Sequence, residues 1–291
     1  MTAKQTFILG VGCQKAGTTW LHDYLQSRED VMLALPKELH IFDAMLRPDM
    51  HARLGQIHTI RHLSRGLKGR LKDALGVRKR NEARPVMRME MIKNPQSYVE
   101  FFKGFDPDAA LIGEITPSYS TLSAANFRFI RELLEPHFDL RVVLLLRDPV
   151  KRAFSASRHF ARVQSDHYPI AFAGGDDESF KALLSSSFIL ERGDYQATLI
   201  ALDEAFDPEQ VYVEFFERLF TPEAVSGLTD FLGLPPVPAN FDRKVNAAPN
   251  AARPDPELLG KARSTYQATY TYCADRFGKD VIEELWGSPR L

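Results

Sequence analysis

Apolar residues gather into short runs along this chain, and longer segments with helical spacing separate the runs. Runs of this length are typical of strands, whereas apolar positions that repeat every three or four residues are typical of helices. The predicted strands cover residues 7–12, 31–35, 110–113, 141–146 and 210–214. The predicted helices cover residues 17–27, 94–103, 124–137, 149–163, 179–184, 195–206, 222–232, 256–276 and 280–286.

This alternation predicts an α/β fold: a P-loop-like, doubly wound parallel sheet flanked by helices. The segment 141–146 is apolar at each of its last five positions, so it indicates a strand that is buried on both faces. A length of 291 residues fits one such domain, and we expect 1–291 to form it. The prediction includes a basic helical insertion over about 47–90 and C-terminal helices over about 255–286.

Charge and cysteine content narrow the class of protein. The chain has 37 Lys and Arg against 38 Asp and Glu, so its net charge of −1 gives no reason to expect a nucleic-acid partner. Cys13 and Cys273 are far apart and show no metal-ligand spacing, which indicates a reducing compartment. The N-terminus has no signal-peptide pattern, and no apolar run approaches the ~20 residues of a membrane span. We therefore expect a cytoplasmic protein.

The segment from Phe7 to Leu21 joins a predicted buried strand to a helix through a turn that contains glycine. In phosphate-binding loops of this layout, the first amides of the helix point at an anion. Gly12 and Gly17 are separated by four residues, as in the nucleotide-triphosphatase loop, but Thr18 stands where that motif has its lysine. The lysine of this loop is Lys15. The loop therefore fits a nucleotide-type donor with an anionic terminal group, bound without a metal.

A second candidate anion site follows the strand at 141–146. Arg147 comes first, Asp148 and Pro149 then begin a helix, and Ser155 follows two turns later. Because both loops follow parallel strands, both should lie at the same edge of the sheet. The planar guanidinium of Arg147 suits a phosphate, although a salt bridge to Asp148 or to another acid is the alternative.

Two segments resemble the donor-binding motifs of the sulfotransferases. Gln14–Leu21 is similar to their 5′-phosphosulfate loop, and Arg147–Ser155 is similar to their 3′-phosphate motif. The resemblance implies transfer of a sulfuryl group from 3′-phosphoadenosine 5′-phosphosulfate (PAPS) to a hydroxyl or amine. It implies an in-line displacement without metal, with adenosine 3′,5′-bisphosphate (PAP) as the nucleotide product. The implied donor-binding residues are Lys15, Ala16, Gly17, Thr18, Thr19, Trp20, Arg147 and Ser155.

The segment 37–42 resembles a Lys-Glu-x-His-Phe-Phe-like segment of the Golgi glycan sulfotransferases and their bacterial relatives. The resemblance implies that Glu38 is the general base that takes the proton of the acceptor, and that Lys15 is a second catalytic residue. His40 is the second candidate, because an imidazole titrates near neutral pH. The alternative is structural: Glu38 pairs with Lys37 or Lys15, and His40 packs against Phe42.

The segment 113–119 resembles a third segment of the same relatives, with one departure. Those enzymes often have Glu-Lys-Thr-Pro, and Ile115 replaces the lysine here. The missing positive charge argues against a heparan-like polyanionic acceptor. Whether the acceptor is a glycan, a lipid or a small molecule stays open, and Thr116–Tyr119 is expected to shape its pocket and to pack the end of the strand.

Two basic segments have several interpretations. Residues 61–84 contain nine Arg and Lys against two acids, and Leu63, Leu67, Leu71 and Leu75 recur every four residues. A helix of this kind is a solvated lid, a binding surface for an anionic acceptor, or a peripheral contact with an anionic membrane at the inner face. The loop 243–253 is a candidate to close over the donor, with Arg253 as a ligand, or it is a solvated basic loop.

Two other functions compete with a sulfotransferase. A P-loop kinase or nucleotidase acting on a small molecule would need magnesium, but Thr18 replaces its lysine and Arg147 follows the strand where an acid is expected. A non-catalytic nucleotide-binding protein that docks on membranes would bind PAP without transferring any group.

Overall fold

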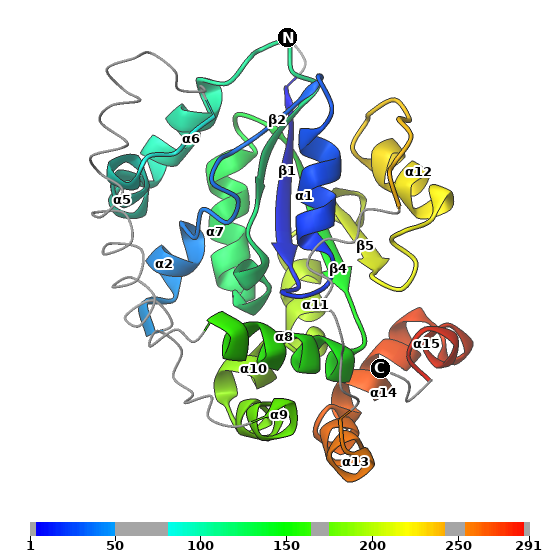
Figure 1. Cartoon of the computed structure of the whole chain (residues 1–291). Helices are drawn as coiled ribbons and strands as arrows, with labels where there is room; N and C mark the ends of the chain where they lie inside the picture. Colours follow the sequence, from blue (N-terminus) through cyan, green and yellow to red (C-terminus); the bar gives the residue numbers. More distant parts are fainter. Residues whose placement is uncertain (1–3, 50–80, 164–174, 242–253, 288–291) are drawn as a thin grey trace.

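Helices cover a parallel sheet in the computed structural model of this chain (Figure 1). The structure describes residues 4–49, 81–163, 175–241 and 254–287. These residues form a five-stranded sheet with the order β2-β3-β1-β4-β5, and all neighbouring strands are parallel. The strands are β1 (Thr6–Gly12), β2 (Val31–Leu33), β3 (Leu111–Ile115), β4 (Asp139–Leu146) and β5 (Val211–Phe215). The predicted α/β fold is therefore confirmed.

The central strands β1 and β4 bring the two predicted anion loops together. Val142–Leu146 is at most 1% exposed, as expected for a strand covered on both faces. β1 and β4 pair in parallel up to Gly12 and Leu144, so their carboxyl ends are neighbours. The loop that contains Lys15 and the loop that contains Arg147 consequently leave the sheet side by side.

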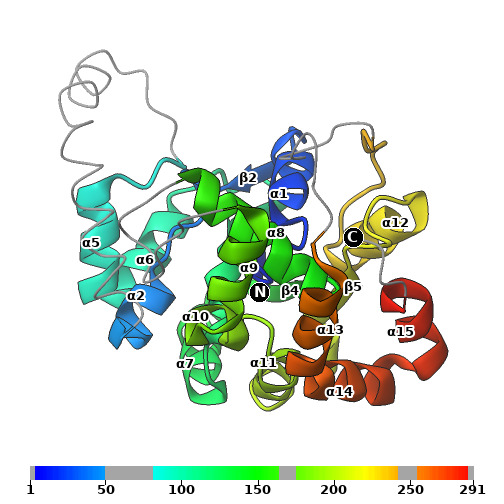
Figure 2. The same ribbon diagram turned by 60° about the horizontal axis from the view of Figure 1, so that its bottom comes forward.

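The helices form two layers with the sheet between them. In Figure 2, α1 (Thr18–Gln26) and α12 (Pro222–Phe231) lie on one side, whereas α7 (Ala124–Leu134) and α11 (Tyr195–Asp203) lie on the other. Helix α8 (Pro149–Val163) lies below the carboxyl ends of the strands in Figure 1. The remaining elements are α2 (Phe42–Leu46), α5 (Pro85–Lys93), α6 (Pro95–Lys103), η1 (Pro117–Thr121), α9 (Asp176–Leu184), α10 (Ser187–Glu191), η2 (Pro208–Gln210), α13 (Pro256–Thr265), α14 (Gln267–Phe277) and α15 (Lys279–Trp286).

Several predicted boundaries are wrong, and three of them have a clear physical reason. The predicted helix 256–276 is two helices, because Tyr266 leaves helical geometry (φ −97°, ψ 16°) with its ring buried. The predicted strand 110–113 continues to Ile115, since Glu114 is buried inside β3. Residues 81–84 are not helical: Glu82 forms an isolated parallel bridge with Leu35. Residues 61–80 of the basic segment lie outside the described residues.

Among the described residues, no helix has the length and apolar character needed to cross a membrane.

Candidate active site

The loop between β1 and α1 leads into α1 through a glycine in left-handed geometry. Gly17 is the N-cap of α1 and has a φ of 91°. A Cβ at Gly17 would lie 2.7 Å from Cδ2 of Leu219, so a side chain does not fit there. Because glycine has no side-chain oxygen, no cap hydrogen bond uses the first amides of α1, and its first turn contains no acid. These amides and the positive end of the helix dipole therefore remain available to an anionic ligand.

Arg147, directly after β4, is hydrogen-bonded to this loop. Its Nη1 donates to the carbonyl oxygen of Lys15 at 2.9 Å, and its guanidinium lies 4.3 Å from the centre of the Phe216 ring. The hydroxyl of Tyr195 donates to the carbonyl oxygen of Arg147 at 2.7 Å. Nε of Arg147 has no hydrogen-bond partner among the described residues. The guanidinium thus joins the two loops, and its buried Nε is left without a hydrogen-bond partner.

The predicted helix cap at Asp148 is confirmed, and the alternative salt bridge to Arg147 is not formed. Oδ1 of Asp148 accepts a hydrogen bond from the amide of Lys151 at 2.9 Å. Oδ2 accepts a hydrogen bond from the hydroxyl of Tyr270 at 3.1 Å. Asp148 is therefore occupied by the helix start and by α14, and the charge of Arg147 is not neutralised by it.

Trp20 has a different environment from the rest of the predicted loop residues. Its side chain is 5% exposed and stacks on Tyr24 with 5.5 Å between ring centroids. Its Nε1 donates to the carbonyl oxygen of Asn240 at 3.4 Å. These contacts give the indole a packing role between α1 and the segment before residue 242.

The other predicted donor-binding residues stand in or beside the two loops. Ala16 is buried, and Thr18 and Thr19 begin α1. Ser155 is half-buried on α8, two turns beyond its start. Arg253 lies outside the described residues.

Basic side chains surround the amine of Lys15. Burial lowers the pKa of Lys15 to about 8, and the charges of Arg147 and Arg162 act in the same direction. Burial also lowers the pKa of His159 on α8 to about 4, with the charges of Lys15 and Arg162 adding to the effect. Positive groups that lower one another's pKa create a positive potential, and an anion bound there would be stabilised.

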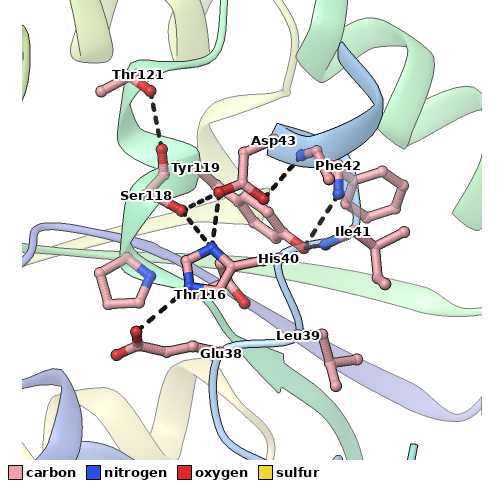
Figure 3. Close-up of polar contacts among 12 residues, drawn as sticks. Glu38, Leu39, His40, Ile41, Phe42, Asp43, Thr116, Ser118, Tyr119 and Thr121 are labelled. Atoms are coloured by element: carbon pink, nitrogen blue, oxygen red, sulfur yellow. Dashed lines mark hydrogen bonds and ion pairs between the residues drawn. The ribbon is translucent and has the colours of Figure 1, made fainter. Parts of the chain in front are cut away.

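The turn between β2 and α2 carries a second cluster of charged side chains (Figure 3). Nζ of Lys37 lies 2.5 Å from Oε1 of Glu38, which is the pairing that the sequence left open. Nε2 of His40 lies 3.6 Å from Oε2 of Glu38, and its Nδ1 lies 2.8 Å from Oδ2 of Asp43. The hydroxyl of Ser118 donates to Asp43 and lies 3.1 Å from Nδ1 of His40. Positive and negative groups therefore alternate along the cluster.

This alternation sets the charge state of both candidate bases. Burial opposes the charged form of His40, but the charge of Asp43 and hydrogen bonds to Asp43 and Glu38 raise its pKa to about 9. Burial likewise opposes the carboxylate of Glu38, but His40 and Lys37 lower its pKa to about 2. At neutral pH His40 is an imidazolium with both nitrogens protonated. Only Glu38, whose side chain is 39% exposed, is in a form that accepts a proton.

Ser118, His40 and Asp43 do not form a hydrolytic triad. In such a triad, the serine and the acid contact opposite nitrogens of the imidazole. Here Oγ of Ser118 and Oδ2 of Asp43 both contact Nδ1, whereas Nε2 faces Glu38. In the described part of the chain, no group of three or more His, Cys, Asp or Glu side chains is placed to hold a metal ion.

Three non-glycine residues adopt a positive φ among the described residues: Lys15 at 69°, Glu38 at 65° and His40 at 55°. They are the three residues predicted as catalytic. Left-handed geometry costs an L-residue roughly 1–2 kcal/mol, and such residues concentrate at functional sites. The unfavourable backbone geometry therefore occurs at the same three residues whose side chains are the catalytic candidates.

Two members of the charged cluster were not predicted. Asp43 follows His40 by three residues, and this spacing of an acid and an imidazole was the signal available in the sequence. Ser118 comes from η1, separated from His40 by 78 positions, and no local pattern connects them.

Comparison with known proteins agrees with this geometry. A model of the sulfotransferase family matches residues 7–238. The chain belongs to the sulfotransferase family. The fold of this sulfotransferase is similar to that of a sulfotransferase from Alicyclobacillus acidocaldarius, with a TM-score of 0.60 and 18% identity over 94% of this chain and 96% of that one. The resemblance found in the sequence is thereby confirmed at the level of the family and the fold.

Two weaker likenesses concern the sulfotransferase domain of the Synechococcus PCC 7002 olefin synthase and mouse sulfotransferase SULT7A1 complexed with PAP. The first has a TM-score of 0.49 and 20% identity over 94% of this chain and 97% of that one. The second has a TM-score of 0.43 and 14% identity over 90% of this chain and 65% of that one. These scores are too low to add to the argument. No curated protein sequence matches this sulfotransferase significantly.

Proposed function

We propose that this sulfotransferase transfers a sulfuryl group from PAPS to a hydroxyl or amine acceptor by a metal-free in-line displacement. The observation that carries the proposal is the hydrogen bond from Arg147 to the carbonyl oxygen of Lys15, at 2.9 Å. It joins two anion-binding groups at the ends of neighbouring strands. PAPS has anionic groups on both its 5′ and 3′ sides, so two linked anion sites match its charge distribution.

In this proposal, the first amides of α1 and Lys15 hold the 5′-phosphosulfate, and Arg147 and Ser155 hold the 3′-phosphate. As the bond from sulfur to the bridging oxygen breaks, the electron pair leaves with PAP. The ammonium of Lys15 stabilises the charge on that oxygen. By analogy with oxyanion holes, one such donor is worth about 2.7–4 kcal/mol of barrier.

Glu38 takes the proton of the acceptor in the same step. A carboxylate with a pKa of about 2 is a weak base in water. Its weakness is tolerable here, because the acceptor oxygen becomes strongly acidic while its bond to sulfur forms. Lys37 and His40 hold Glu38 ionised, so it is ready to accept the proton at neutral pH.

Further features bear on the compartment and the acceptor. Cys13 and Cys273 are free and buried, which supports a function in the reducing cytoplasm.

Ile115, at the position of the lysine in the Golgi relatives, is 1% exposed and lies against Gly10, so its side chain belongs to the core. Contact with an anionic membrane through 61–84 stays a hypothesis from the sequence.

A thermal-shift assay with PAP and with ATP–magnesium tests the proposal. A ligand at 100 times its Kd stabilises the folded protein by about 2.7 kcal/mol. At about 2.1 cal/mol/K of unfolding entropy per residue, this corresponds to a rise in Tm of roughly 4–5 °C for a chain of 291 residues. PAP should produce this rise, and ATP–magnesium should produce a smaller one. A rise with ATP–magnesium alone would contradict PAPS as the donor and would favour a P-loop kinase or nucleotidase.

A further inference from the structure

The turn that carries Glu38 and His40 needs to be held in place by the rest of the fold. Both residues adopt positive φ angles, 65° and 55°. This geometry is unfavourable for an L-residue and persists only where surrounding contacts hold it. The turn is not part of a helix or strand, since β2 ends at Leu33 and α2 begins at Phe42. Its geometry must therefore come from contacts with other elements.

The hydroxyl of Tyr119 supplies such contacts (Figure 3). It accepts hydrogen bonds from the backbone amides of Ile41 at 3.1 Å and Phe42 at 3.4 Å. It donates its own proton to Oε1 of Glu114 at 3.0 Å. A phenol has one proton and two lone pairs, so all the hydrogen-bonding capacity of Tyr119 is used. The side chain is 0% exposed, and no water competes for these bonds.

Glu114 accepts the proton of the Tyr119 hydroxyl. Its carboxylate, in β3, also accepts hydrogen bonds from the hydroxyls of Tyr98 and Thr116, both at 2.6 Å. Burial raises the pKa of Glu114, and the three hydroxyls oppose that rise by favouring the ionised form. Because the amides of Ile41 and Phe42 can only donate, they take both lone pairs of the Tyr119 hydroxyl, and its own proton must point toward Glu114.

We propose that Tyr119 is a positioning residue of the active site: with Glu114 behind it, its hydroxyl holds the amides of Ile41 and Phe42 and thereby fixes Glu38 and His40. The effect on transfer rests on the proposed function, whereas the effect on the turn does not. Other side chains assist. Arg88 donates to the carbonyl oxygen of Leu39, and Ser118 contacts Asp43.

Tyr98 provides a matched control. It is a tyrosine, it is 0% exposed, and its hydroxyl donates to the same oxygen, Oε1 of Glu114. No hydrogen bond connects the Tyr98 hydroxyl to the turn in the described structure. Tyr119→Phe and Tyr98→Phe therefore remove the same group from the same carboxylate, and both keep the ring in the core.

Three measurements compare the two variants. Thermal unfolding should show a loss of Tm in both, and a larger loss in Tyr119→Phe, because that variant also leaves the amides of Ile41 and Phe42 without their acceptor. Binding of PAP, measured by calorimetry, should stay within twofold of wild type in both. Release of labelled sulfate from PAPS, with water as the acceptor, should fall at least tenfold in Tyr119→Phe and less than twofold in Tyr98→Phe.

A readout independent of transfer is the titration of the His40 imidazole by NMR, assigned with a His40→Gln variant. The pKa of His40 is about 9 in the intact turn, because of Asp43 and Glu38. In Tyr119→Phe it should move toward 6.5, and in Tyr98→Phe it should not move. Equal behaviour of the two variants in both assays would overturn the proposal. If wild type neither binds PAP nor releases sulfate, the sulfotransferase mechanism is wrong, and the titration still decides the role of Tyr119.

Discussion

Arg147→Lys is a sharp test of how this sulfotransferase would bind its donor. The variant keeps the positive charge but removes the planar fork. In wild type, Nη1 is used by the carbonyl oxygen of Lys15, and the guanidinium has further N–H groups on Nη1 and Nη2 with which it would bind a phosphate. A lysine can make one hydrogen bond to a phosphate where a planar guanidinium makes two. The expected loss is one hydrogen bond to a charged group, about 1.5–3 kcal/mol.

That loss corresponds to a weakening of PAP binding by about 10- to 150-fold, at 1.4 kcal/mol for each factor of ten. The assay is calorimetry at fixed salt with PAP and with adenosine 5′-monophosphate, which lacks the 3′-phosphate. Binding of the monophosphate should weaken less than about threefold, on the same scale of energies. Equal weakening of both ligands would refute the reasoning, because it would mean that Arg147 only supports the Lys15 loop.

Arg158→Lys is the matched control for this experiment. Arg158 lies in α8, the helix that begins two residues after Arg147, and it pairs with Asp176 at 3.1 Å and lies 5.8 Å from the Phe154 ring centre. Its replacement should leave the affinities for both ligands unchanged. A loss in this variant would indicate a general effect of replacing an arginine in this region, and not the loss of a direct contact with the donor.

Two other predictions concern the charged groups that would act in transfer. Lys15 has a pKa of about 8 in the free protein, because of burial and then the charges of Arg147 and Arg162. Binding of PAP favours the protonated amine, so affinity should fall above pH 8 by up to about tenfold per pH unit, and Lys15→Arg should have a flat profile from pH 7 to 9.5. A wild-type profile as flat as that of the variant would contradict this. Glu38→Gln should keep the affinity for PAP within twofold and lose transfer by roughly 10²–10⁴-fold, the usual contribution of a general base. Loss of PAP binding in Glu38→Gln, measured by calorimetry, would remove Glu38 from the role of base.

The sequence predicted the sheet well because its central strands are continuous apolar runs. The run before Arg147 could only be a strand buried on both faces, and it is β4. Asp148 followed by Pro149 predicted the start of α8, and the cap is present. Local chemistry of this kind can be read directly, because it depends on residues close together in the chain.

The sequence was less informative where distant side chains decide the local structure. The sequence predicts that the strand ends before Glu114, since a lone carboxylate is rarely buried. Three hydroxyls make its burial possible, from Tyr98 in α6, Thr116 directly after β3 and Tyr119 in η1, and β3 continues to Ile115. Tyr266, where the predicted helix 256–276 is interrupted, is likewise in contact with a distant residue. Its ring packs against Gly193 so closely that a Cβ at Gly193 would lie 2.4 Å from the ring. The charged cluster around His40 likewise needs Ser118, which only the fold brings near.

The three positive φ angles have a consequence for how this chain tolerates change. Glycine or asparagine at the positions of Lys15, Glu38 and His40 would relax the backbone, by roughly 1–2 kcal/mol for each left-handed residue, less the added freedom of the unfolded chain. The same replacements would remove the ammonium, the carboxylate and the imidazolium. Selection for thermal stability alone would therefore push these positions away from activity, and libraries that aim at a more robust enzyme should leave them fixed.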